Sequence, residues 1–120
     1  MNGRRLLVPS VALALIAAVL GERSAHAASK EEAALELARK AISVDYLETR
    51  FADAEKKLQQ AIVLCEPEGA CSDKVRAKLH ASLGVIYVGG MSRRDDGKAQ
   101  FIEALKKDAA VALDADLVSP

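Results

Sequence analysis

The sequence contains no tryptophan and very few other aromatic residues. Two phenylalanines and two tyrosines make up 3% of its 120 residues. Strands are rich in aromatic and β-branched residues, whereas this chain is rich in alanine, so the composition favours helices over sheets. Hydrophobic residues make up 51% of the chain and charged residues 28%, which is typical of a globular protein. At this length we expect one all-α domain.

An excess of charge of either sign is also absent. The 17 lysines and arginines balance the 17 aspartates and glutamates, so the formal net charge is zero. Nucleic acids and anionic lipids attract proteins through an excess of basic residues. We therefore expect no nucleic-acid partner and no electrostatic binding to membranes.

Residues that could carry out chemistry are scarce. His80 has no serine and aspartate around it that could form a nucleophilic set, so a packing role is favoured. Asp95 and Asp96 stand at a helix start, where capping explains them, and Arg93 and Arg94 beside them are expected to be solvated. The glycines near residue 90 are not followed by the Lys-Ser/Thr pair of a phosphate-binding loop. We expect no enzymatic activity and no cofactor.

The N-terminal segment has the three parts of a secretory signal peptide. Two arginines lie among the first five residues, an uncharged apolar run covers residues 6–20, and Ala25 and Ala27 provide small side chains at alternate positions. This order of basic, apolar and small-residue segments is typical of a cleaved export signal. The sequence therefore predicts a signal peptide over residues 1–27.

Cleavage before Ala28 would leave 93 residues with a formal charge of −2. We expect this chain to be periplasmic or secreted and to have no stable membrane span. The alternative is a chain anchored in the membrane by an uncleaved N-terminal helix. A spanning helix needs about 20 apolar residues, however, and this run has only 15, one of which is Pro9.

Residues 30–65 carry the apolar periodicity of two helices. Steps of three and four separate the apolar residues, which places them on one face of each helix. Ser29 and Glu32 form a capping box ahead of a first helix at about 30–47, and a short turn leads to a second helix at about 51–65. The first stripe is Ala34, Leu35, Ala38, Ala41, Ile42 and Tyr46; the second is Phe51, Ala54, Leu58, Ala61, Ile62 and Cys65, with Lys56, Lys57, Gln59 and Gln60 facing away.

A second pair of helices follows a loop that contains Pro67 and Gly69. Ser72 is the N-cap of a third helix that ends at Gly89-Gly90, and Ser92 or Asp95 caps a fourth helix at about 93–107. Short loops make consecutive helices antiparallel neighbours, so we expect hairpins at about 30–65 and 73–107. The apolar stripes are Val75, Leu79, Leu83, Ile86 and Tyr87 in the third helix, and Phe101, Ile102 and Leu105 in the fourth.

The two hairpins align with each other at an offset of 43 residues. The second hairpin gives His80-x2-Leu83-Gly84-x2-Tyr87, followed by Gly97-x3-Phe101 and Ala104. This series resembles the tetratricopeptide repeat, whose pattern is W-x2-L-G-x2-Y and then A-x3-F. A histidine stands in place of the tryptophan and a glycine in place of the first alanine. The first hairpin resembles the pattern less closely, through Ala54, Leu58 and Ala61.

The resemblance implies a short α-solenoid over residues 28–109, with two degenerate repeats packed through these matching residues. Gly84 and Gly97 would be small where paired helices approach closely. The first helix of each hairpin would form a concave face that holds a peptide or partner protein of unknown identity. Its contact residues would be Lys40, Ser43, Tyr46, Arg76, Lys78 and Ser82.

The arrangement also resembles exported tetratricopeptide proteins of bacterial envelopes. This resemblance implies a non-enzymatic scaffold that binds a protein or peptide. An unrelated four-helix bundle is the alternative fold. The alternative functions are a structural segment of a larger envelope complex and a small exported regulator without a peptide groove.

Cys65 and Cys71 are the only cysteines, and five residues separate them across a loop. Export makes oxidation favourable, so we predict a structural disulfide that fixes the loop between the hairpins. Free thiols are the first alternative, and a redox pair or a metal site is the second. Two thiolates and one distant histidine are too few for a zinc site, so we expect no metal.

The C-terminal segment, residues 110–120, is apolar but has no helical stripe of its own. Its last two residues, Ser119 and Pro120, are typical of a helix start. Repeat arrays usually end in a polar capping helix. We therefore expect an exposed apolar patch on the third and fourth helices, together with self-association. The alternative is a tail that folds back over the fourth helix.

Overall fold

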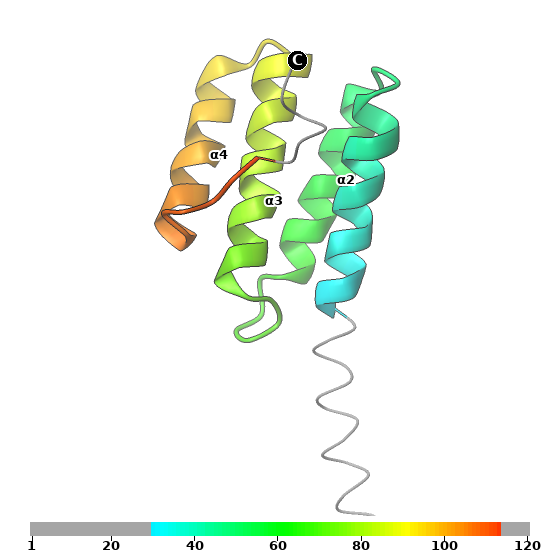
Figure 1. The fold of residues 1–120 in the computed structure, drawn as a ribbon. Coiled ribbons are helices and arrows are strands. Elements are labelled where there is room, and N and C mark those ends of the chain that lie inside the picture. Colours follow the sequence, from blue (N-terminus) through cyan, green and yellow to red (C-terminus); the bar gives the residue numbers. More distant parts are fainter. Residues whose placement is uncertain (1–29, 114–120) are drawn as a thin grey trace, which may run out of the picture.

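The computed structural model describes residues 30–113, and all regular structure within that range is helical. The first helix covers residues 30–46 and ends in the π-helical turn η1 (Ala41–Tyr46). It is followed by α2 (Phe51–Leu64), α3 (Asp73–Val85) with its π-helical end η2 (Ile86–Gly90), and α4 (Arg94–Lys107). The four helices lie side by side and consecutive ones run antiparallel (Figure 1). This arrangement confirms the predicted all-α class, and the helix ends that lie within the described residues agree with the predicted bounds to within two residues.

The turns inside the two hairpins have the same backbone geometry. Thr49 and Ser92, which are 43 residues apart, adopt left-handed conformations with φ of 62° and 54°. Arg50 and Arg93 then serve as the N-caps of α2 and α4, again 43 residues apart. The prediction that Ser92 or Asp95 caps α4 is therefore wrong. Ser92 forms the turn itself, and Asp95 already lies in the first turn of the helix.

Large aliphatic side chains and many alanines form the core. Leu58, Leu79 and Ile86 are the largest fully buried side chains, and they come from α2, α3 and η2. The described part of the first helix contributes Ala34, Ala38, Ala41 and Ile42 to the buried set. Because these side chains are short, the helices can pack closely along much of their length. The N-cap at Ser72 is confirmed, since its hydroxyl accepts a hydrogen bond from the backbone N–H of Val75 at 3.2 Å.

The contact between α3 and α4 depends on two glycines. A methyl group at Gly97 would lie 2.3 Å from Val88 Cγ2 and 2.9 Å from the carbonyl oxygen of Gly84. A methyl group at Gly84 would lie 2.7 Å from Phe101 Cε1. All three distances are shorter than a Cβ atom tolerates, so a larger residue at either position would force neighbouring atoms to shift. The predicted close approach of these helices is confirmed.

The apolar face predicted for α4 is partly exposed to solvent. Ile102 is 45% exposed and Leu105 is 53% exposed, whereas Gly97 and Ala104 are buried against α3. Val88 at the end of α3 is also an exposed large hydrophobic residue. Large apolar side chains are therefore exposed on both the third and the fourth helix in the described part of the chain. Within the described residues, α4 packs mainly against α3 and its π-helical end η2.

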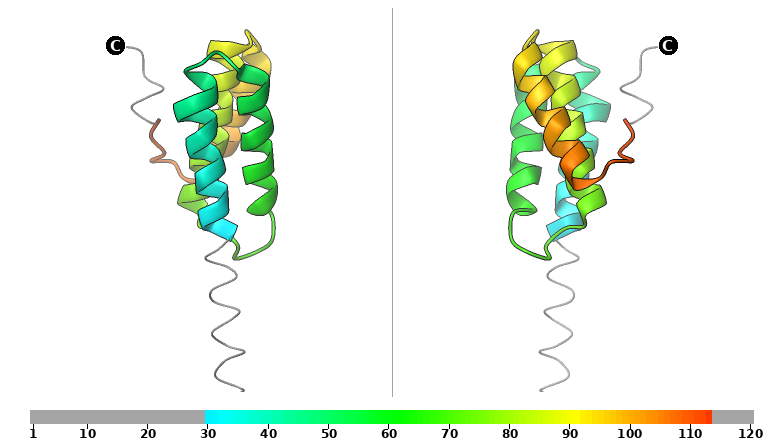
Figure 2. Two further views of the ribbon diagram at one scale, coloured as in Figure 1. Left: turned by 90° about the vertical axis from the view of Figure 1, so that its right-hand side faces the viewer. Right: turned by 90° about the vertical axis from the view of Figure 1, so that its left-hand side faces the viewer.

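The chain turns back after α4. Residues 108–113 pass over α3 on one side of the bundle (Figure 2) and line a groove together with Leu35 of the first helix. The described part of the tail thus covers α3 and not the outer side of α4. No helix within residues 30–113 is long and apolar enough to cross a membrane. The predicted signal peptide, its cleavage site and the capping serine at position 29 lie outside the described residues.

Candidate binding groove

A groove lies between the first helix, α3 and the returning tail. It has a volume of about 520 Å3. Leu35 on the first helix and Val75 on α3 contribute aliphatic side chains to its lining, and both belong to the apolar stripes predicted from helical periodicity. The other lining residues are Lys74, Lys78, Asp108, Ala110, Val111, Ala112 and Leu113. The first helix of each hairpin thus contributes to the lining of the groove.

Aliphatic and charged groups are combined in this groove. Leu35 is 38% exposed although it is a large hydrophobic residue. Two lysine side chains, at positions 74 and 78, come from successive turns of α3. A surface of this kind can bury aliphatic side chains and attract carboxylates at the same time.

The structure places the six predicted contact residues in different environments. Lys78 lines the groove. Ser82 is only 2% exposed, so it is not available to a partner on the described surface. Arg76 is directed to the loop after α2, where its Nη2 donates to the carbonyl oxygen of Pro67 at 3.0 Å. Tyr46 packs against Phe51, with 5.6 Å between the ring centroids.

The two remaining predicted contacts lie on the first helix, and neither lines the groove. Lys40 is exposed, and its Nζ is 4.0 Å from Glu36 Oε1. Ser43 is half-buried within η1. Only one of the six predicted residues is therefore placed in the groove, because helical periodicity specifies a face but not the angle at which two helices meet.

The residues that matched the repeat pattern pack the helices together. Ten positions carry the resemblance, and most of them are buried. His80 is half-buried, and its Nδ1 is 2.7 Å from Gln100 Oε1 on α4. The buried members are Ala54, Leu58, Ala61, Leu83, Gly84, Tyr87, Gly97 and Ala104, and Phe101 is half-buried. The packing role assigned to His80 is consistent with its contact to the neighbouring helix.

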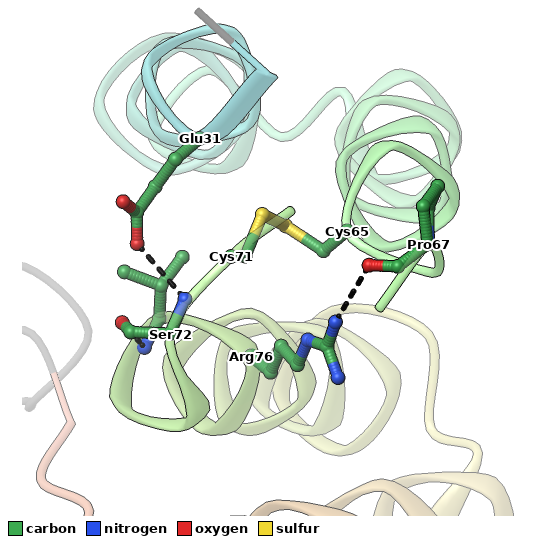
Figure 3. Close-up of a disulfide and its surroundings, with 7 residues drawn as sticks. Glu31, Cys65, Pro67, Cys71, Ser72 and Arg76 are labelled. Carbon is green, nitrogen blue, oxygen red and sulfur yellow. Dashed lines mark hydrogen bonds between the residues drawn. A yellow bond between two sulfur atoms is a disulfide. The ribbon is translucent and has the colours of Figure 1, made fainter. Parts of the chain in front are cut away.

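A disulfide joins Cys65 at the end of α2 to Cys71 ahead of α3, as predicted (Figure 3). The two Cα atoms are 5.1 Å apart, and both side chains are buried. Glu31 Oε1 on the first helix accepts a hydrogen bond from the backbone N–H of Ser72 at 3.1 Å. Ser72, at the end of the loop, is therefore bonded to the first helix, and Pro67, near its start, is bonded to Arg76 on α3. Together these bonds fix the N-terminus of α3, which carries one wall of the groove.

Sequence reasoning missed a buried carboxylate. Asp45 in η1 is 2% exposed. Arg50 Nη2 donates to its Oδ1 at 2.9 Å, and Lys57 on α2 donates to its Oδ2. These hydrogen bonds, that from Lys57 above all, hold the pKa of Asp45 below its ordinary value of 3.8 against the opposing effect of burial. Lys57 is therefore half-buried and paired, rather than facing away from the core as predicted.

Arg93 is also paired rather than merely solvated. Its guanidinium carbon lies 4.3 Å from the centroid of the Tyr87 ring. Its Nη1 donates to Glu55 on α2 and its Nε to Asp96, both at 2.8 Å. Burial raises the pKa of the Tyr87 hydroxyl above its ordinary value of 10.0. This arginine thus connects the two hairpins at the end opposite the disulfide.

The 43-residue offset could have predicted one ion pair in each hairpin, between an arginine and the aspartate three residues later. It aligns Arg50 with Arg93 and Asp53 with Asp96, and each arginine contacts the acid three residues later. Asp45 aligns with Val88, so its buried position has no counterpart in the second hairpin. Its partner Lys57 is twelve residues away, and only the folding of the first hairpin brings the two together.

Comparison with known proteins found no matching family model, no matching curated protein and no matching solved structure. Within residues 30–113, no group of three or more histidine, cysteine, aspartate or glutamate residues could hold a metal ion. The proposed function therefore rests on the groove and on the packing residues that match between the two hairpins.

Proposed function

We propose that the protein is a non-enzymatic scaffold of the bacterial cell envelope that binds a protein or a peptide. The groove of about 520 Å3 between the first helix and α3 is the observation that carries this proposal. The aliphatic residues that the helices contribute, Leu35 and Val75, and the lysines of the groove suit an extended segment with small apolar side chains. The groove also lies on the face to which the tetratricopeptide resemblance assigns ligand binding.

The proposal can be tested by capture of partners from an envelope extract. Purified protein is immobilised, and a pool of short peptides is added as competitor. We expect the peptides to release the bound partners, because both occupy one groove. Leu35→Asp places a carboxylate in the groove and should reduce capture at least about tenfold, which corresponds to 1.4 kcal/mol.

Val63→Asp is the matched control for the capture experiment. Val63 is an exposed valine on α2 that does not line the groove, so this change adds the same charge elsewhere. We expect capture by this variant to equal that of the unchanged protein. Capture that resists peptides and survives Leu35→Asp would contradict a peptide groove.

A specific observation favours the alternative of a structural segment. At the 43-residue offset, Ile102 and Leu105 on α4 correspond to Gln59 and Ile62 on α2. Gln59 donates to the Tyr87 hydroxyl at 3.4 Å, and Ile62 packs against the core next to α3. The exposed side of α4 thus corresponds to a surface of α2 that receives another helix. Capture of one large assembly that peptides cannot release would support this function.

The proposed location is the periplasm or the extracellular space. The disulfide supports it, because such bonds persist mainly in oxidising compartments. Mass spectrometry of the extracytoplasmic fraction should find Ala28 as the first residue. Recovery of the intact N-terminal segment in the membrane fraction would instead indicate an anchored protein.

A further inference from the structure

We propose that a second pocket binds a small organic acid, with one carboxylate on an apolar body about the size of a benzene ring. The pocket lies where the end of α2, the first half of α3 and the end of α4 meet, and its volume is about 190 Å3. It shares no lining residue with the groove. The inference therefore goes beyond the proposed function and does not depend on it.

The pocket combines apolar and basic residues. The apolar lining residues are Ile62, Cys65 and Leu79, the basic ones are Arg76, His80 and Lys107, and Glu66 is the acid among the described residues of this lining. Because the basic residues outnumber the acid, a carboxylate is favoured over an amine. The apolar residues provide a surface on which the rest of a small ligand can be buried.

Arg76 is the residue that points most directly to an acid. Its Nη2 donates to the carbonyl oxygen of Pro67 at 3.0 Å, which holds the guanidinium beside the end of α2 (Figure 3). Its Nε is buried and has no hydrogen-bond partner within the described part of the chain. A buried donor without an acceptor is costly, and a carboxylate is the acceptor that a guanidinium binds best.

His80 and Lys107 add two basic side chains from different helices. His80 Nδ1 is 2.7 Å from Gln100 Oε1, a contact that holds the ring between α3 and α4. Glu103 lies near both residues but is paired with Lys106, whose Nζ donates to its Oε1 at 3.1 Å. The C-terminal end of α4 adds partial negative charge beside Lys107. We therefore assign most of the binding to Arg76.

The volume of the pocket limits the size of the ligand. An apolar cavity of about 150 Å3 can hold one benzene molecule. A pocket of about 190 Å3 is thus large enough for one ring that carries a carboxylate. In this arrangement the ring would pack against Ile62 and Leu79 while the carboxylate pairs with Arg76.

Benzoate is the probe, titrated into isotope-labelled protein and followed by NMR at the amides of Leu79 and His80. Benzamide has the same ring without the charge, and acetate has the charge without the ring. We expect both to bind at least about tenfold more weakly than benzoate, because each lacks one of the two contacts. The amide of Leu35, which lines the groove, should not shift.

Two variants test the basic residues. Arg76→Lys keeps the charge but removes the Nε donor, so benzoate should bind at least about tenfold more weakly. Lys107→Gln removes one nearby charge and should weaken binding about threefold. Lys98→Gln is the matched control, because Lys98 is an exposed lysine of the same helix that does not line the pocket. It should bind benzoate as the unchanged protein does.

Absence of any shift with benzoate would overturn the inference. Benzamide or acetate binding as tightly as benzoate would also overturn it, since the ring or the charge alone would then explain the binding. Full benzoate affinity in both Arg76→Lys and Lys107→Gln would show that the ligand binds elsewhere. None of these results affects the capture of partners through the groove, so the proposed function is tested separately.

Discussion

At the scale of single residues, two kinds of buried position hold this small fold together. One is the carboxylate of Asp45, which is removed from water but receives hydrogen bonds from Arg50 and Lys57. The other is the pair of glycines where α3 and α4 meet. In the first case stability depends on a charge that must be compensated, and in the second on the absence of a side chain.

We expect Asp45→Asn to lower the free energy of unfolding at pH 7 by about 1–2 kcal/mol, because the negative charge that strengthens the hydrogen bonds from Arg50 and Lys57 is lost. Folding lowers the pKa of Asp45, so its stabilising effect is complete above the unfolded pKa near 3.8 and is lost as the pH falls through the folded value. The variant should therefore lose less stability than the unchanged protein between pH 7 and pH 3. Urea unfolding at several pH values measures both effects.

Asp53→Asn is the control for that measurement. Asp53 is exposed, and its Oδ2 is 3.9 Å from Arg50 Nε, so this change should alter stability by less than about 0.5 kcal/mol. Identical unfolding curves for the two variants at pH 7 would contradict the role assigned to Asp45.

Gly97→Ala should destabilise the protein by about 1–3 kcal/mol, because the added methyl group meets Val88 and the backbone of Gly84. Thermal unfolding followed by circular dichroism measures the change. Lys98→Ala, at an exposed position of the same helix, should leave the midpoint nearly unchanged. A Gly97→Ala midpoint equal to that of the unchanged protein would show that α4 can move away from α3 at little cost.

At the scale of elements, the loop between the hairpins determines where α3 begins. Its disulfide, the Ser72 N-cap and the hydrogen bond from the Ser72 N–H to Glu31 all act on the same few residues. The turns inside the hairpins are instead set by left-handed residues and by the arginines that follow them. Each junction in the described part of the chain therefore has its own covalent or polar constraint.

Alkylation without reductant should label neither Cys65 nor Cys71 in the exported protein, because both sulfur atoms are bonded. Replacement of both residues by serine should lower the free energy of unfolding by about 2 kcal/mol, since closing so short a loop restricts the unfolded chain only modestly. Addition of a reductant should lower the stability of the unchanged protein and not that of the variant. Stoichiometric labelling of both thiols would contradict the bridge.

At the scale of the whole molecule, two surfaces of the described fold differ in their surroundings. The first helix and α3 line an open groove together with the protein's own tail. The outer side of α4 keeps Ile102 and Leu105 exposed. The groove is the site that we propose for a peptide, and the exposed side of α4 is the site that we propose for a further helix.

We expect self-association that depends on the exposed side of α4. Sedimentation velocity over a range of concentrations should show association of the unchanged protein and a marked weakening by Leu105→Asp, because a buried carboxylate is costly to desolvate. Val63→Asp on α2 should associate like the unchanged protein. A monomer at all concentrations, or equal association of both variants, would exclude this surface.

Much of the fold could be predicted from the sequence, because local features determine it. Helical periodicity, the Ser72 cap and the breakers at Pro67, Gly69 and Gly89-Gly90 specified four helices and their bounds. The 43-residue offset specified two similar hairpins with small residues at their contacts. The cysteine spacing pointed to the disulfide. Only tertiary structure decided that Asp45 meets Lys57, that Ser82 is buried and that the tail after α4 lines the groove. These outcomes depend on the angles and distances between helices, which a one-dimensional pattern does not contain.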